Sequence, residues 1–203
     1  MKLTWLGHAC FALEQDGYRI VIDPYTNVEG HADVQTSAHA VYCSHQHYDH
    51  SAVEGITLLP ARECPFTVRT VKTCHDEEGG ALRGENWIHI FSTGGITIAH
   101  LGDLGHQLTP EQLSSIGKVD GILVPIGGTY TVDAAGAKQV CDAIGPKWVV
   151  PMHYRHTPYG FAVLTTLEDF TQLWRAEQVH VNPTAQLEVT PDTAGVQVLT
   201  FGA

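Results

Sequence analysis

The sequence is poor in positive charge, and this limits the partners that it can have. Lysine and arginine together number 11 against 22 acidic residues, so the formal net charge at pH 7 is −11. Binding to nucleic acid without sequence preference requires clustered lysine and arginine, which displace counterions from the phosphates, and the sequence contains no such cluster. An acidic membrane surface is an equally poor partner for this charge. We therefore expect neither nucleic acid nor membrane as a partner.

Several further features are missing. No apolar run approaches the roughly 18 residues of a membrane-spanning helix, and the first residues lack the basic segment and long apolar stretch of a secretory signal. The five cysteines are an odd number without a C-x-x-C pair, which is typical of reduced cysteines. A G-x-S-x-G segment, which would indicate a serine nucleophile, is also absent. These absences predict a cytoplasmic protein that does not use an activated serine.

The pattern of apolar residues predicts one α/β domain over residues 1–203. Strands are expected at residues 3–6, 10–13, 18–22, 40–43, 56–59, 66–73, 87–91, 96–101, 119–124 and 148–150, with three more in the tail that ends at Phe201. Helices are expected after the capping box at Thr109, after Asp133 and over residues 166–177. The polar segment 27–38 is expected to be a loop. This order predicts two sheets packed together with helices outside.

The thirteen histidines are scattered rather than grouped in a run, so they are not an expression tag. Three of them lie with one aspartate in the segment H-Q-H-Y-D-H at residues 45–50, directly after a predicted buried strand. Imidazole and carboxylate ligands suit zinc, manganese or iron. His45 and His47 are two residues apart and lie on one side of an extended chain, whereas Asp49 and His50 would face a second point. A polar surface loop with chance histidines is the alternative.

This H-x-H-x-D-H pattern after a strand resembles the metallo-β-lactamase superfamily. The resemblance extends over most of the chain and implies a four-layer α/β/β/α sandwich. The segments W-L-G-H at residues 5–8, P-I-G-G-T-Y at 125–130 and P-M-H-Y at 151–154 are similar to one branch in particular, the short hydrolases that resemble L-ascorbate-6-phosphate lactonase. The implied metal ligands are His45, His47, Asp49, His50, His75, Asp103 and His153.

The resemblance also implies how these ligands are shared. One ion is expected on His45, His47 and His75, and the other on Asp49, His50 and His153, with Asp103 bridging ions that lie about 3.5–4 Å apart. We expect Zn²⁺ first, with Mn²⁺ or Fe²⁺ as alternatives.

Three residues are expected around the ligands. Asp23 would orient a ligand histidine by accepting its second N–H. His8, in a turn between strands, is a candidate catalytic residue. His100, on the strand that leads to Asp103, is a candidate for orienting the site, and an ordinary core histidine is the alternative for it.

The implied centre indicates a hydrolase. Two divalent ions, two aspartates and one hydroxide leave a charge near +1, which favours a small anionic substrate. Metal-bound hydroxide would attack an ester, lactone or phosphoester, and Asp49 would carry out the proton transfer. Arg155 and Arg83 are candidate anion-binding residues, and a solvated loop arginine is the alternative for Arg155.

Two other classes stay open. They are a mononuclear iron redox enzyme of the sulfur dioxygenase type and a metal-binding protein without catalysis. The sequence leaves open whether the protein forms a homo-oligomer.

Overall fold

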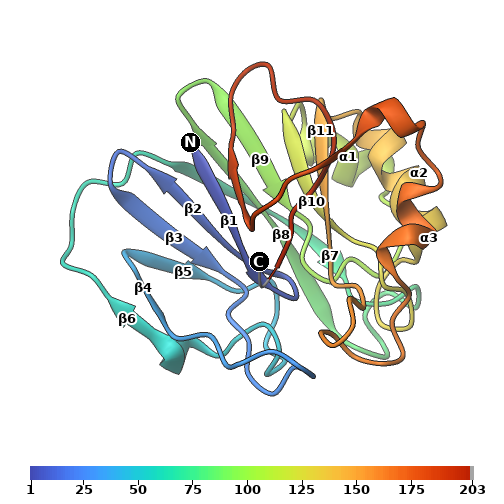
Figure 1. The fold of residues 1–203 in the computed structure, drawn as a ribbon, viewed down its shortest axis with the longest axis horizontal. Coiled ribbons are helices and arrows are strands. Elements are labelled where there is room, and N and C mark those ends of the chain that lie inside the picture. Colours follow the sequence, from blue (N-terminus) through green and yellow to red (C-terminus); the bar gives the residue numbers. More distant parts are fainter. Residues whose placement is uncertain (202–203) are drawn as a thin grey trace.

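The computed structural model describes residues 1–201, in which two large β-sheets pack against each other (Figure 1). The first sheet has the strand order β13-β1-β2-β3-β5 and the second has the order β12-β14-β11-β10-β9-β8-β7. The strands of the first sheet are β1 (Lys2–Gly7), β2 (Cys10–Gln15), β3 (Tyr18–Ile22), β5 (Ala40–Tyr42) and β13 (Gln186–Glu188).

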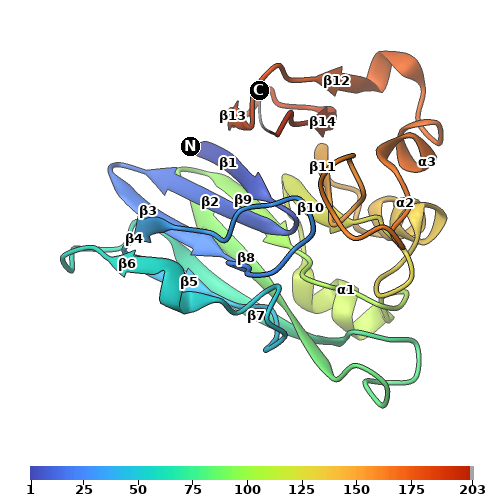
Figure 2. The same cartoon turned by 60° about the horizontal axis from the view of Figure 1, so that its bottom comes forward.

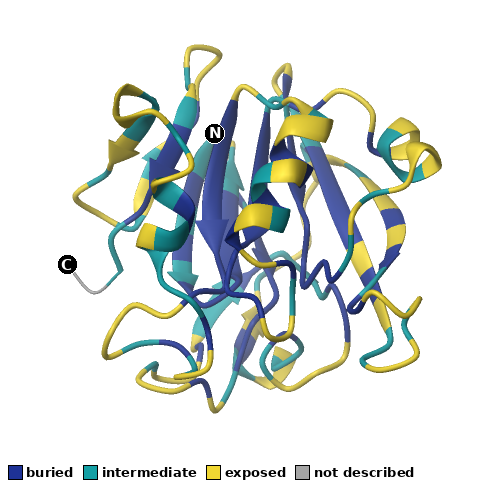
Figure 3. Ribbon diagram, turned by 90° about the vertical axis from the view of Figure 1, so that its right-hand side faces the viewer, coloured by how far each residue is buried: buried dark blue, intermediate teal, exposed yellow. Residues whose placement is uncertain are grey.

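The second sheet carries the helices on its outer face, where α1 packs on β7, and α2 packs on β10 and α3 (Figure 3). Its strands are β7 (Thr67–Cys74), β8 (Glu85–Thr93), β9 (Ile96–His100), β10 (Gly121–Pro125), β11 (Trp148–Met152), β12 (Val179–Val181) and β14 (Gly195–Val198). The helices are α1 (Pro110–Ile116), α2 (Ala134–Ile144) and α3 (Leu167–Thr171), and the 3₁₀ turn η2 (Ala176–Gln178) follows.

The core lies between the two sheets. Strand β1 alternates in burial and turns Leu3 and Trp5 inward, as the two-residue period of a strand requires. These side chains join Phe11 of β2 and Ile88 and Ile98 of the second sheet in one buried apolar cluster. Burial of this cluster holds the two sheets face to face.

The outer face of the first sheet is covered by the two-stranded sheet of β4 (Thr36–Ala38) and β6 (Ile56–Leu58) with the 3₁₀ turn η1 (Val53–Gly55). The small side chains of Cys10 and Ala12 pack there against this cover. The fold is thus the expected α/β sandwich, but within residues 1–201 this outer layer contains no α-helix.

Two expected elements differ in the structure. The segment 27–38, expected as a loop, contains β4, which pairs in parallel with the distant β6. The helix expected over 166–177 ends at Thr171, because the N–H groups of Leu173 and Trp174 bond only three residues back, to Phe170 and Thr171, and η2 follows. The first difference comes from pairing with a distant segment, and the second from a local change in hydrogen bonding.

The strand directions bring distant segments to one edge of the sandwich. Strands β9, β10 and β11 are parallel neighbours, and β7 runs in the same direction because β8 is antiparallel to both β7 and β9 (Figure 2). Their carboxyl ends therefore meet at one edge, where ligands bind in open sheets of this kind.

No helix within residues 1–201 has the length and apolar character needed to span a membrane.

Candidate metal centre

Six histidines and two aspartates converge at this edge, each in a segment that follows a strand. Their potential ligand atoms form groups within which all atoms lie within 4.8 Å of one another. The groups are His45, His47 and His75; His8, Asp49, His50 and His153; and His45, His50 and Asp103. The structure therefore brings together all seven ligand candidates from the sequence, and it adds His8 to the second group.

Asp103 lies between the first two groups. Its Oδ2 is 3.2 Å from Nε2 of His75 in the first group, and 3.2 Å and 3.3 Å from Nε2 of His50 and His153 in the second. Burial would raise the pKa of Asp103, but His153 and His50 outweigh it and hold the pKa well below its usual range. Asp103 is therefore a carboxylate that can face both groups at once.

The donor atoms fit metal ions. Within the described residues, Nε2 of His45 and Oδ1 of Asp103 are buried without a hydrogen-bond partner, as are both ring nitrogens of His8. Buried polar atoms are normally paired, and cations would satisfy these. Burial, together with His50, lowers the pKa of His45 to about 3, so its ring is neutral and offers a lone pair at pH 7. Nitrogen and carboxylate donors in this arrangement suit zinc, manganese or iron.

Two ligand candidates are oriented by their second ring nitrogen. Nδ1 of His50 donates to Asp23 over 2.9 Å, and Nδ1 of His75 donates to the carbonyl oxygen of Tyr130 over 3.0 Å. The Asp23 carboxylate is fully buried and also accepts from the backbone N–H and the hydroxyl of Ser44, both over 2.6 Å. Each histidine is thereby left with Nε2 facing the centre.

The turn that carries Asp103 is held by two buried side chains. His100 donates from Nε2 to the carbonyl oxygen of Ala9 over 2.8 Å and accepts at Nδ1 from the N–H of Gly102 over 3.1 Å. Asn86 of β8 accepts from the N–H of Asp103 over 2.9 Å. Sequence reasoning missed Asn86, because a single asparagine in a strand carries no local signal.

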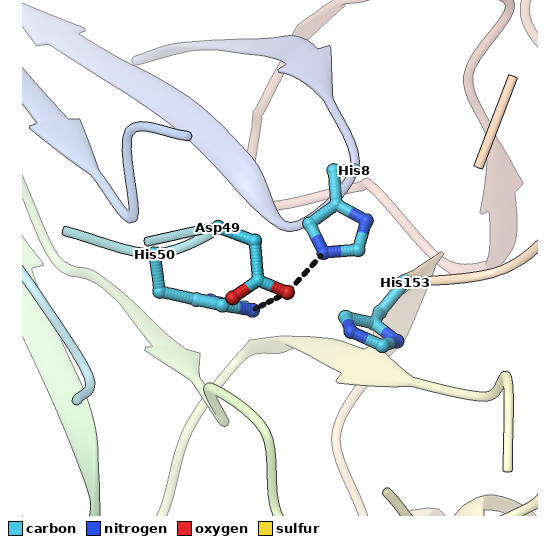
Figure 4. A group of neighbouring side chains, drawn as sticks. All are labelled: His8, Asp49, His50 and His153. Atoms are coloured by element: carbon cyan, nitrogen blue, oxygen red, sulfur yellow. Dashed lines mark ion pairs between the residues drawn. The ribbon is translucent and has the colours of Figure 1, made fainter. Parts of the chain in front are cut away.

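His8 lies in the turn between β1 and β2, with its Nε2 3.5 Å from Oδ2 of Asp49 (Figure 4). Its ring centroid is 4.2 Å from that of His153, and Figure 4 shows the side chains of His8, Asp49, His50 and His153 pointing toward one another. Burial, and then His153, lower the pKa of His8 to about 3, so its ring is neutral at pH 7.

A pocket of about 300 Å³ opens over the centre. It is lined by His47, Tyr48, Asp49, His75, Arg83, Asp103, Tyr130 and Phe161. Of the two arginines expected to bind an anion, Arg83 lines this pocket and Arg155 does not. After His153 the chain buries Tyr154 against Trp5, and Arg155 is exposed with its N–H bonded to the carbonyl oxygen of Thr165.

The loop that carries Arg83 is organised by Asp76, which sequence reasoning also missed. One carboxylate oxygen accepts from the N–H groups of Glu78 and Gly80, and the other accepts from those of Leu82 and Arg83, over 2.7–3.0 Å. Burial would raise the pKa of Asp76, but these four hydrogen bonds outweigh it and lower the pKa. The backbone of Arg83 is therefore fixed beside the pocket.

Comparison with known proteins gives one family. Residues 2–153 match the family described as Beta-lactamase superfamily domain. A UPF0173 metal-dependent hydrolase of Carboxydothermus hydrogenoformans is 31% identical, with 83% of this chain and 91% of that relative covered. A protein of the same description from Archaeoglobus fulgidus is 29% identical, with 89% of this chain and 94% of the relative covered.

Comparison with solved structures agrees with this family assignment. A Thermotoga maritima crystal structure that its name places among the Zn-dependent hydrolases of the metallo-β-lactamase superfamily is 35% identical, with a TM-score of 0.75 over 98% of this chain and 97% of that one. A metallo hydrolase of Ignicoccus hospitalis has a TM-score of 0.57 at 22% identity, over 85% of this chain and 89% of that one. At that identity the likeness shows the fold alone.

Proposed function

This chain belongs to the metallo-β-lactamase superfamily and is a metal-dependent hydrolase, and from that premise we propose that it hydrolyses a small anionic ester, lactone or phosphoester at a centre of two divalent ions. The observation that carries the proposal is the position of the Asp103 carboxylate between two groups of ligand atoms. A centre for one ion would need only one of those groups.

The proposed ligand sets follow the two groups. His45, His47 and His75 would hold one ion; Asp49, His50 and His153 would hold the other; and Asp103 would contact both. Zn²⁺ is the first candidate, and Mn²⁺ or Fe²⁺ would also accept these donors. When bound, such ions lower the pKa of a coordinated water toward about 7 and polarise a carbonyl or phosphoryl oxygen.

The side chains around the pocket would supply the rest of the chemistry. Asp49 is half-buried at the pocket wall and can accept a proton at Oδ2. His8 lies 3.5 Å from that oxygen and would hold the carboxylate in place. Arg83, the cation among the lining residues, would bind the anionic group of the substrate.

Two measurements test this proposal. Mass spectrometry gives the metal content per chain, and a screen of lactones and phosphodiesters gives the activity. Two divalent ions per chain and turnover of one of these substrates are expected. One iron per chain with oxygen consumption would instead indicate a redox enzyme of the sulfur dioxygenase type. Two ions without any turnover would indicate a metal-binding protein without catalysis.

A further inference from the structure

Three aromatic side chains form the wall of the pocket above the centre. Tyr48 follows β5, Tyr130 follows β10 and Phe161 follows β11, so the fold gathers them from distant parts of the chain. The Tyr130 and Phe161 rings meet edge to face, with 6.4 Å between their centroids and 82° between their planes. Phe161 also meets His8 edge to face at 5.6 Å. The aromatic wall is therefore continuous with the candidate metal centre.

Two of these rings face solvent, and the backbone of one of the two is tied to the centre. The side chains of Tyr48 and Tyr130 are 54% and 38% exposed, and exposed apolar surface in a concave site marks ligand binding. The carbonyl oxygen of Tyr130 accepts the hydrogen bond from His75, which ties the backbone of this residue to the centre. Arg83 lies at the same rim, with its guanidinium carbon 5.8 Å from the Tyr130 ring centroid.

We propose that this pocket takes an aryl ester or aryl phosphoester, with its flat ring against Tyr48, Tyr130 and Phe161 and its anionic group facing Arg83 and the centre. A cavity of about 150 Å³ is enough for benzene, so the pocket of about 300 Å³ holds one ring together with the ester group. The inference rests on the proposed function, which supplies the reacting ester group. It narrows the substrate to esters and phosphoesters that carry an aromatic ring.

Binding of two phosphonates to the zinc-loaded protein, measured by calorimetry, tests the inference without turnover. Phenylphosphonate and methylphosphonate carry the same anion and differ in the ring. We expect phenylphosphonate to bind about 10- to 100-fold more tightly, because the ring is removed from water. Equal affinities, or no measurable binding of either probe, would overturn the inference.

Variants of the residues that line the pocket test where the preference for the phenyl probe arises. Phe161→Ala and Tyr130→Ala should each reduce the phenyl preference several-fold, while Tyr130→Phe should retain it because the ring remains. Arg83→Ala should weaken both probes alike. Val181 of β12 is an exposed apolar residue outside this pocket, so Val181→Ala is the control and should change neither affinity. A preference that survives both alanine variants of the pocket would refute the placement of the ring.

Turnover separates this inference from the proposed function. A phenyl preference in binding without hydrolysis of any ester would support the aryl pocket and contradict the proposed function. Equal binding and equal hydrolysis of phenyl and methyl esters would contradict the aryl pocket and support the proposed function.

Discussion

Three non-glycine residues at the candidate centre have left-handed backbones. The φ angles of His8, Asp23 and His153 are 51°, 49° and 53°. An L-residue in this region costs about 1–2 kcal/mol, and such strain persists only where the surrounding structure fixes it. His8 and His153 are each the first residue after a strand and must turn a side chain sharply toward the centre. The backbone is thus strained where two sheets present side chains to one point.

Asp103 is the residue on which metal stoichiometry should depend most. Its Oδ2 lies within 3.3 Å of Nε2 of three histidines from both groups. Asp103→Ala and Asp103→Asn should reduce the bound metal from two ions per chain to one or fewer, because the shared charged ligand is lost. Metal analysis by mass spectrometry measures this. The exposed Asp192→Asn is the control, and an Asp103→Ala protein that retains two tightly bound ions would contradict the bridging role.

His31 should make the stability of the fold depend on pH. Its half-buried ring packs against Tyr159 and Phe201, and burial, and then His156, lower its pKa from 6.5 to about 4. Between these two values the unfolded chain binds more protons than the folded one, so the free energy of unfolding falls as the pH falls through this window. Above pH 6.5 the contribution of His31 does not change.

Urea unfolding at pH 7.5 and pH 5 measures this dependence. His31→Gln should lose less stability than the wild type between the two values, whatever its stability at pH 7.5. The exposed His180→Gln should behave as the wild type does. Identical pH slopes for His31→Gln and the wild type would rule out the contribution of His31.

At the scale of elements, strands were predicted better than the segments between them. A strand such as β1 follows from its own alternating pattern, and so does the position of a ligand directly after a strand. By contrast, β4 exists because it pairs with β6, and the backbone at Arg155, which does not line the pocket, bonds to Thr165 ten residues further along the same connection. A local pattern cannot show either pairing, because each partner lies elsewhere in the chain.

The loop of residues 76–84 should depend on Asp76, whose two carboxylate oxygens each accept two backbone N–H groups. Asp76→Ala removes all four acceptor bonds, and Asp76→Asn retains one acceptor oxygen. Hydrogen exchange at the amides of Leu82 and Arg83 should therefore accelerate most in Asp76→Ala and less in Asp76→Asn. Mass spectrometry of the peptide that contains the loop measures this.

A control lies in the same loop. Glu77→Gln removes an exposed charge next to Asp76 and should leave the exchange rates unchanged. Tryptic cleavage after Arg83 should follow the same order as exchange, because both require local opening. Wild-type exchange rates in Asp76→Ala would show that the loop is held by other contacts.

At the scale of the whole molecule, the candidate centre joins the two sheets. His8 and His45 follow strands of the first sheet, whereas His75, Asp103 and His153 follow strands of the second. The sequence motif at residues 45–50 predicted the dense part of this set. It could not show that His8 reaches His153, because that proximity depends on the packing of the β1–β2 turn against β11, where the N–H of His153 bonds to the carbonyl oxygen of His8 over 3.3 Å.

Removal of metal should therefore loosen the contact between the sheets as well as abolish activity. Ions that bind only the folded state stabilise it by about 2.7 kcal/mol per site at a free concentration of 100 times Kd. For a chain of this size, each kcal/mol shifts Tm by about 2–4 °C. Chelation should thus lower Tm by about 5–10 °C for each site emptied, and added Zn²⁺ should restore it. The exposed His180→Gln should show the full shift, whereas Asp103→Asn, which weakens the ligand common to both groups, should show a smaller one. An unchanged Tm after complete removal of metal would mean that the apolar core alone sets the packing of the sheets.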